Sequence, residues 1–216
     1  MNLASRTGAW AKAGTIPSGW VEVEWVRSTY GGSTTLMPTT YIDTGVVGNV
    51  PMKFKAKVLF PEVVDNSAFF GARNGRNGRF QGGISPEGTT AGHFAVGYGS
   101  SLYYDGNVTK ETLYDLSFDY KVGFQKFSIN ESDTYEHHST ESITTNRNIW
   151  LFACNSTTGW YGTGDVMIYS FEIEGLRNFV GVRNITTDEV AMCEILTGEI
   201  YHNAGSGAFT CGSDKT

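Results

Sequence analysis

The segment Met52–Phe60, MKFKAKVLF, alternates strictly between apolar side chains and lysines. Its apolar residues occupy every second position, and Lys53, Lys55 and Lys57 fill three of the positions between them. Successive side chains of a strand point to opposite faces, so this period predicts a strand with one face in a core and one in water.

Other parts of the chain repeat this period. Tyr114–Tyr120 and Met167–Glu174 alternate over their whole lengths. The positions expected to share the buried face of the second segment are Met167, Tyr169, Phe171 and Ile173. Shorter strands are predicted at Trp20–Val26, Ala68–Ala72, Arg79–Ile84, His93–Tyr98, Val122–Ile129, Ile149–Cys154, Phe179–Val182 and Glu189–Cys193.

Glycine-containing turns separate these strands. They are predicted at Asn74-Gly75, Asn77-Gly78, Asp105-Gly106-Asn107 and Thr197-Gly198, where glycine accepts the positive φ angles of tight turns. Many short strands with tight turns, and no segment of helical period, predict an all-β fold. We expect a two-sheet antiparallel β-sandwich. Trp20, Trp25 and Trp150 lie inside strand patterns and are expected in its core.

Composition narrows the class of protein. The 216 residues suffice for one domain, and 13% aromatic residues against 18% charged residues exclude a disordered chain. The net charge of −6 and the lack of a Lys/Arg run argue against nucleic acid as a partner. No segment has the length and apolarity of a membrane span or of a secretory leader.

Domain boundaries follow from the same composition. Residues 1–17 lack alternation and are predicted to be an N-terminal arm, residues 18–212 the domain, and residues 213–216 a tail. The three cysteines, Cys154, Cys193 and Cys211, fit no metal spacing and are expected as reduced thiols. A bridge between Cys193 and Cys211 is the alternative.

Two segments carry a resemblance to a known family. Trp25–Thr29 with Thr39–Gly45, and Leu176–Gly212, resemble the opening and the ending of concanavalin A-like lectin/glucanase domains, which are laminin G-like jelly rolls. GARNGRNGRF, from Gly71, and NIWLFACNSTTGWYGTGDVMIYSFEI, from Asn148, are similar to the middle of such domains. The resemblance implies a jelly-roll sandwich. Domains of this kind occur in surface proteins of gut bacteria and in virion proteins of their phages.

This sequence departs from the pattern of the family in three places. Tyr30–Pro38 is an insertion, Cys193-Glu194 replaces a Tyr-Asp pair, and Tyr135–Thr145 is a polar extension. Glucanases of the fold use a Glu-x-Asp-x-x-Glu strand, whereas Glu22 with Glu24 and Glu172 with Glu174 lack the third carboxylate. We expect both pairs on the water-facing side of their strands and predict no catalytic residue.

Metal binding is left open by the sequence. His137 and His138 are adjacent, so a strand would point them to opposite faces. The resemblance makes a structural calcium ion the one cofactor worth considering. Its candidate oxygen ligands are Asp43, Asp65, Asn66, Asp105 and Asn107, and no spacing singles out one set. Otherwise no cofactor is expected.

Carbohydrate binding is the function that the loop residues favour. A sugar ring needs an aromatic platform and planar hydrogen-bonding groups, and glycine-rich segments of this chain contain both. The predicted carbohydrate-binding residues are Trp160, Tyr161, Arg73, Asn74, Arg76, Tyr98 and Tyr103. The alternative is that the aromatic residues cap the core and that the Arg-Asn segment is a solvated hairpin.

We therefore expect a non-catalytic binding module. The expected partners are the surface glycan of a bacterial host, other virion proteins through residues 1–17, and a second copy of the chain. The expected location is a virion surface, with a bacterial cell surface as the alternative. A structural decoration protein that binds no sugar is the second hypothesis, and a glucanase-type enzyme is the third.

Overall fold

The computed structural model describes residues 15–28, 37–75, 78–84, 92–139, 145–157, 162 and 164–216. Within these residues all regular secondary structure is extended. The strands are β1 (Trp20–Glu22), β2 (Val26–Ser28), β3 (Ile42–Val47), β4 (Met52–Leu59), β5 (Ala68–Asn74), β6 (Gly78–Ile84), β7 (His93–Gly99), β8 (Ser101–Asn107), β9 (Leu113–Lys121), β10 (Phe124–Ile129), β11 (Asp133–His138), β12 (Asn148–Leu151), β13 (Asn155–Ser156), β14 (Val166–Ile173), β15 (Arg177–Asn184), β16 (Val190–Glu194), β17 (Glu199–Tyr201) and β18 (Thr210–Cys211).

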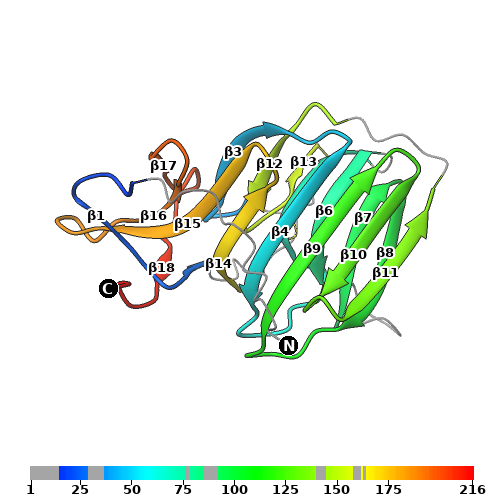
Figure 1. Ribbon diagram of the computed structural model, residues 1–216, viewed down its shortest axis with the longest axis horizontal. Helices are drawn as coiled ribbons and strands as arrows, with labels where there is room; N and C mark the ends of the chain where they lie inside the picture. Colours follow the sequence, from blue (N-terminus) through cyan, green and yellow to red (C-terminus); the bar gives the residue numbers. More distant parts are fainter. Residues whose placement is uncertain are drawn as a thin grey trace, which may run out of the picture.

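The strands form two sheets that pack face to face (Figure 1). The large sheet has 11 strands in the order β11-β10-β9-β4-β14-β15-β16-β17, with β1 on β15, β2 on β14 and β18 on β2. The small sheet has 7 strands in the order β3-β12-β5-β6-β7-β8, with β13 on β5. The pairs are antiparallel except β13–β5, which is parallel. The predicted all-β, two-sheet sandwich is confirmed.

Aromatic rings fill the space between the sheets. Phe70 of the small sheet lies 5.0, 5.1 and 5.3 Å, between ring centroids, from three phenylalanines of the large sheet, Phe54, Phe118 and Phe171. All four rings are at most 2% exposed. Edge-to-face and tilted rings at these separations pack favourably, so this cluster joins the two layers.

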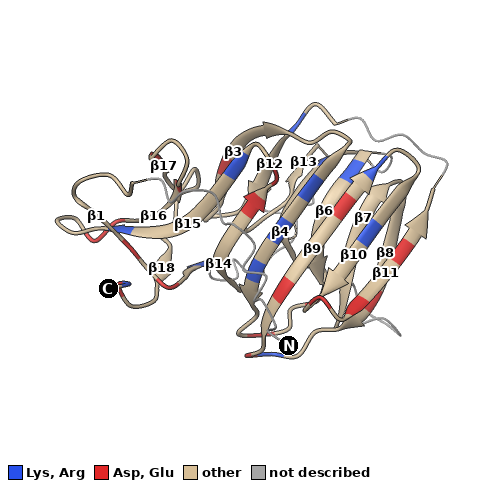
Figure 2. Cartoon of the chain, viewed as in Figure 1, with Lys and Arg blue, Asp and Glu red and all other residues tan. Residues whose placement is uncertain are grey.

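Strand β4 has the two faces that its sequence predicts. Met52, Phe54, Ala56 and Val58 are buried, and the lysines between them project outward. Lys55 Nζ lies 3.7 Å from Glu172 Oε2, and Lys53 Nζ lies 3.8 Å from Glu174 Oε1, on the neighbouring strand β14. Figure 2 shows lysines and acidic residues alternating across this outer face of the large sheet. Glu172 and Glu174 therefore lie on the water-facing side, as predicted.

The outer face of the small sheet is built differently, from small and buried residues. Gly71, Gln81 and Gly97 are register neighbours on β5, β6 and β7, and all three are buried. A Cβ atom at Gly71 would lie 2.7 Å from Gln81 Cβ, and one at Gly97 would lie 2.5 Å from Gln81 Cγ. The Gln81 side chain thus fills the space that the two glycines leave, and glycine is required there by close packing.

Bulges correct two predictions. The β4–β14 register shifts between Ile168 and Ser170, so Ile168 is buried while Met167 and Tyr169 are half-buried, against the expected shared face. Asp105-Gly106-Asn107 is no hairpin turn but the end of β8. The pairing passes from Asp105 to Asn107, and Gly106, at φ 60°, forms the bulge. An extra residue in one strand reverses which side chains face the core.

Two predicted strands are each divided in the structure. Trp20–Val26 contains β1 and the first residue of β2, which pair with different strands. In Ile149–Cys154, strand β12 ends at Leu151 because Phe152 has a positive φ of 67°. Of the tryptophans expected in the core, only Trp150 is buried; its ring stacks on Tyr41 at 4.0 Å, outside the main core. Trp20 and Trp25 are half-buried.

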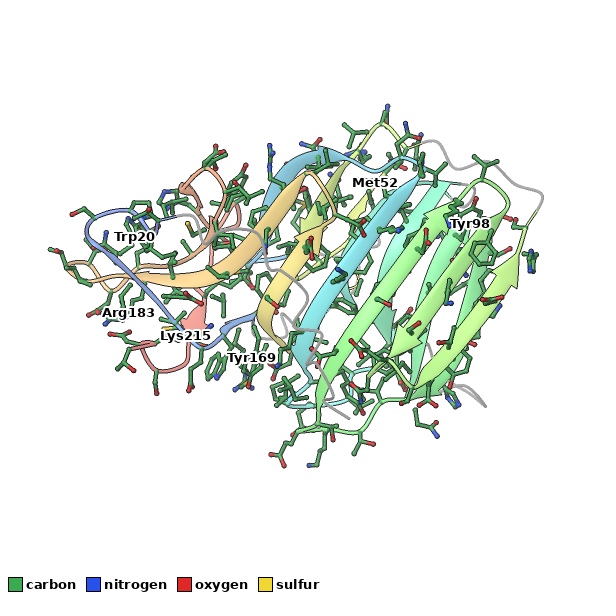
Figure 3. All side chains as sticks on the ribbon, viewed as in Figure 1. Trp20, Met52, Tyr98, Tyr169, Arg183 and Lys215 are labelled. Atoms are coloured by element: carbon green, nitrogen blue, oxygen red, sulfur yellow. The ribbon has the colours of Figure 1, made fainter. Side chains whose placement is uncertain are left out.

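An extension projects beyond the two layers and carries both ends of the described chain (Figures 1 and 3). Ile16 packs on the small apolar cluster of Val182, Ala191 and Cys193. Residues 213–216, expected as a tail, are attached to the extension: Asp214 pairs with Val23, and Lys215 Nζ lies 2.6 Å from Glu22 Oε1. Residues 1–14 of the predicted arm lie outside the described residues.

The cysteines and one buried carboxylate belong to the structural framework. Cys154, Cys193 and Cys211 are free thiols. Glu194 is 1% exposed and accepts hydrogen bonds from the backbone of Asn178, Leu196 and Thr197. Burial alone would raise the pKa of Glu194, but these bonds and one from the Thr197 hydroxyl lower it overall. The described residues contain no helix that is long and apolar enough to cross a membrane.

Candidate functional site

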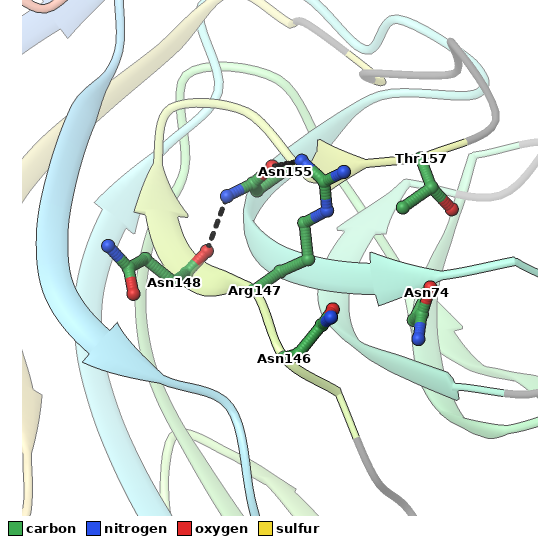
Figure 4. Close-up of a pocket in the computed structure, with 6 residues that line it drawn as sticks. All are labelled: Asn74, Asn146, Arg147, Asn148, Asn155 and Thr157. Atoms are coloured by element: carbon green, nitrogen blue, oxygen red, sulfur yellow. Dashed lines mark hydrogen bonds between the residues drawn. The ribbon is translucent and has the colours of Figure 1, made fainter.

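An open polar pocket of about 390 Å³ lies at one end of the small sheet. Among the described residues that line it, asparagine dominates, and Arg147 is the one charged side chain (Figure 4). The lining residues are Asn74, Asn146, Arg147, Asn148, Asn155 and Thr157. We call it the asparagine pocket. Its amide and guanidinium groups supply the hydrogen-bond donors and acceptors that a small polar ligand requires.

Three short segments bring these residues together. Asn74 ends β5, the segment 146–148 leads into β12, and Asn155 and Thr157 lie in and just after β13. The parallel register places Ser156 beside Arg73, and the Thr157 backbone N–H donates to the Arg73 carbonyl at 3.2 Å. The Thr157 hydroxyl accepts from the Gly75 N–H at 2.9 Å. The pocket is therefore held by backbone contacts between β5 and β13.

Asn155 forms the fixed side of the pocket. Its side chain is 6% exposed, and Nδ2 donates to the carbonyl oxygen of Asn148 at 3.0 Å. Its Oδ1 accepts from Nη1 of Arg147 at 3.3 Å, as the dashed lines of Figure 4 show. A buried amide with both ends bonded does not turn freely, so Asn155 holds the guanidinium in place.

Two asparagines present unused amide groups to the solvent side. The side chains of Asn74 and Asn146 are exposed. In the described part of the chain, neither amide makes a hydrogen bond. Each offers two donors and one acceptor oxygen, the pattern that complements sugar hydroxyl groups or other small polar molecules.

Two further arginines lie beside the pocket on the outer face of the small sheet. Arg73 and Arg79 are register partners on β5 and β6, and Arg73 Nε donates to the Gly75 carbonyl at 2.9 Å. Burial raises the pKa of Cys154 to about 12. The positive charges of both arginines lower the pKa of the buried Cys154 thiol, against this effect. The two guanidinium groups therefore lie near this thiol on the outer face of the small sheet.

The structure separates the site residues that the sequence predicts. Asn74 lines the asparagine pocket, and Arg73 is its half-buried neighbour in β5. Tyr98 is fully buried; its ring stacks on Tyr120, and its hydroxyl donates to the Lys121 carbonyl. The prediction that Tyr98 forms a sugar platform is therefore wrong, because inward-facing positions of β7 belong to the core.

Tyr103 belongs to the far edge of the small sheet. Its ring stacks on His137 at 3.9 Å, and His137 Nε2 lies 2.6 Å from Asp105 Oδ2. These contacts join β8 to β11 of the large sheet and close one side of the sandwich. Tyr103 is half-buried there and is not among the residues that line the asparagine pocket. The structure therefore does not place Tyr103 and Asn74 in one site.

The remaining predicted residues, Arg76, Trp160 and Tyr161, lie outside the described residues. Their sequence neighbours are described: Gly75 precedes Arg76, and Thr157 ends the segment before residues 158–161. Thr157 lines the pocket, and its hydroxyl accepts a hydrogen bond from the Gly75 N–H. The last described residues before the two segments are therefore in contact.

The sequence contains a signal for the pocket that loop composition does not reveal. Asn146-Arg147-Asn148 directly precedes the apolar segment 149–154, and Asn155 directly follows it. Polar planar side chains at both ends of a short buried segment come close together when that segment folds back on one neighbour, as β12 and β13 do on β5. The sequence does not show that the chain turns at Phe152, so it does not predict this proximity.

The candidate calcium ligands have other roles in the described structure. Asp43 Oδ1 accepts from the Gly45 N–H, and Asp65 Oδ1 accepts from the Gly92 N–H. Asp105 is paired with His137. Among the residues that the structure describes, no group of three or more His, Cys, Asp or Glu side chains could hold a metal ion. A calcium site stays a prediction.

Comparison with known proteins adds no relative: no protein-family model and no curated protein matches this chain.

Proposed function

We propose that the chain is a non-catalytic carbohydrate-binding module whose ligand occupies the asparagine pocket. The single observation that carries the proposal is the lining of this pocket by four asparagines, one arginine and one threonine. Sugars present hydroxyl pairs that planar amide and guanidinium groups can bond at two points. The unused amides of Asn74 and Asn146 are the groups that would make the first contacts.

The position of the pocket supports the same proposal. Ligand sites in β folds commonly lie on segments that a rigid scaffold positions, and here β5, β12 and β13 supply that scaffold. Trp160 and Tyr161 lie outside the described residues, and their predicted part in carbohydrate binding stays a proposal.

The carboxylate pairs support binding rather than hydrolysis. Glu172 and Glu174 face Lys55 and Lys53 across the outer face of the large sheet. A glycosidase needs two carboxylates on either side of a bond in a sugar, within a cleft. Ion-paired carboxylates on an open charged sheet favour a structural role.

The biological setting is proposed from the resemblance to concanavalin A-like domains. We propose that the module recognises cell-surface carbohydrate of a bacterium from a virion surface, with a bacterial cell surface as the alternative. Residues 1–17 would attach the module to neighbouring virion proteins. A decoration protein without sugar binding is the rival, and the same experiment decides between them.

The test is binding of the full chain to an array of bacterial capsule and wall polysaccharides. Each lost neutral hydrogen bond weakens binding by about twofold to tenfold, so Asn74→Ala combined with Asn146→Ala should weaken a hit by about tenfold or more. Asn130→Ala, at an exposed asparagine directly after β10 of the large sheet, is the matched control and should leave binding unchanged. An array without hits, or a hit that the double variant leaves intact, would contradict the proposal.

A further inference from the structure

The charge of the asparagine pocket differs from that of the whole protein. The chain has a net charge of −6. Among the described lining residues, Arg147 is the one charged side chain, and no carboxylate is present. The charge of the described lining therefore has the opposite sign to that of the chain.

The described strands of the small sheet contain two acidic residues, Asp43 and Asp105. Asp105 belongs to β8, the edge strand on the other side of the sheet, and its carboxylate is bonded to His137. Asp43 is the register partner of Trp150, and its Oδ1 accepts from its own turn at Gly45. Neither aspartate lines the pocket.

Arg147 differs from a solvated surface arginine in how it is held. The bond from its Nη1 to Asn155 Oδ1 fixes one edge of the guanidinium, while Asn155 is itself held by the Asn148 carbonyl. The rest of the guanidinium faces a hollow of about 390 Å³. A guanidinium that is held before the ligand arrives loses little conformational freedom on binding, and its planar fork fits an anion at two points.

We propose that the ligand of the asparagine pocket is an acidic saccharide, with its carboxylate or phosphate group bound by Arg147 and its hydroxyl groups bound by the asparagine amides. This inference rests on the proposed carbohydrate-binding function and adds the charge of the ligand to it.

The experiment uses the full chain and an array of bacterial polysaccharides with uronate-containing, phosphate-containing and neutral members. Hits should be acidic, and the carboxyl-reduced derivative of a uronate hit should bind about tenfold to hundredfold more weakly, because a charge-assisted hydrogen bond is lost. Hits with phosphate-containing members alone would support the proposal and identify phosphate as the anion. Hits with neutral members alone would overturn it and leave the proposed function intact. An array without hits would overturn both.

Variants assign the anion to the pocket. Arg147→Gln keeps a donor for Asn155 but removes the charge, and it should weaken acidic hits by about tenfold to hundredfold. Arg147→Lys should restore part of the binding, because it keeps the charge and loses the fork. Lys110→Gln, an equal charge change in the loop after β8, should have no comparable effect. Equal binding by the wild-type chain and Arg147→Gln would overturn the assignment.

A measurement on the unaltered chain guards against a variant that fails to fold. Binding of an acidic hit should weaken as the salt concentration rises, since screening acts on the attraction between the anion and Arg147. Salt-independent binding of the acidic hit would contradict the proposal.

Discussion

The two sheets of the sandwich share one interior but have opposite outer faces. On the large sheet, the outward residues are long and charged, and Lys55 is paired with Glu172 across β4 and β14. On the small sheet, the outward residues Gly71, Gln81 and Gly97 are short or folded flat and buried. One face is an open array of charges; the other is closely packed.

This difference shows where a ligand can be held. On the charged face of the large sheet, Lys53, Lys55 and Lys126 form ion pairs with acidic residues of neighbouring strands. At the centre of the small sheet, the described outward residues Gly71, Gln81 and Gly97 are buried. Side chains that are polar, planar and unused occur where the small sheet ends, at Asn74 and Asn146. The candidate site thus lies at the end of the more tightly packed layer.

The interior that both sheets share should give the largest effect. Phe70→Ala removes a ring that contacts Phe54, Phe118 and Phe171, and should lower the free energy of unfolding by about 3–5 kcal/mol. Urea denaturation followed by tryptophan fluorescence measures this. Val122→Ala, at a position that is 70% exposed, is the control and should change stability by less than about 0.5 kcal/mol. Similar values for both variants would contradict the assigned core.

The packed outer face of the small sheet should give an intermediate effect. In Gly97→Ala the new methyl group meets Gln81 Cγ, and overpacking of this kind costs about 1–3 kcal/mol. Adding Gln81→Ala removes the obstructing atom, so the double variant should lose less stability than the two single variants predict by addition. Thermal unfolding of all four chains completes the cycle. Additive losses would show that Gly97 and Gln81 do not compete for one space.

The charged outer face of the large sheet should give the smallest effect. Lys55→Ala breaks an ion pair whose lysine side chain is 57% exposed, and should cost less than about 1 kcal/mol. The same loss should shrink further in high salt, because screening already weakens an exposed pair. Urea denaturation at two salt concentrations checks this. A loss as large as that of Gly97→Ala would erase the contrast between the two faces.

The fold could be predicted where strands have one wet face. β4 and β9 alternate in sequence and in burial, and both match their predicted segments. The strands Ile42–Val47, Ser101–Asn107 and Asp133–His138 lie outside the segments for which the sequence predicts strands. The last of these is an edge strand that pairs on one side only and has mostly exposed residues. Its polar sequence becomes extended because β10 offers a free edge, which is not a local property.

The candidate site could be predicted only in part. Asn74 can be predicted from sequence because a glycine-rich Arg-Asn segment is typical of an exposed hairpin. Tyr98 cannot, because a tyrosine beside glycines is also typical of an exposed turn, whereas β7 is buried on both faces. Arg147 and Asn155 flank the apolar segment Ile149–Cys154, which the sequence predicts to be a single strand. The turn at Phe152 folds that segment back and brings them into contact.

The amino-acid sequence by itself determined the class of fold, the wet face of the large sheet and the absence of helices in the described chain. These follow from a period of two, which acts between neighbouring residues and needs no knowledge of distant ones. The tertiary structure alone decided which polar residues meet. The pocket joins the end of β5 to residues 146–157, more than seventy positions later in the chain. The positive charge of Arg147 is informative only when it is compared with the net charge of the whole chain. Contacts between distant segments depend on register and bulges, which local patterns do not encode.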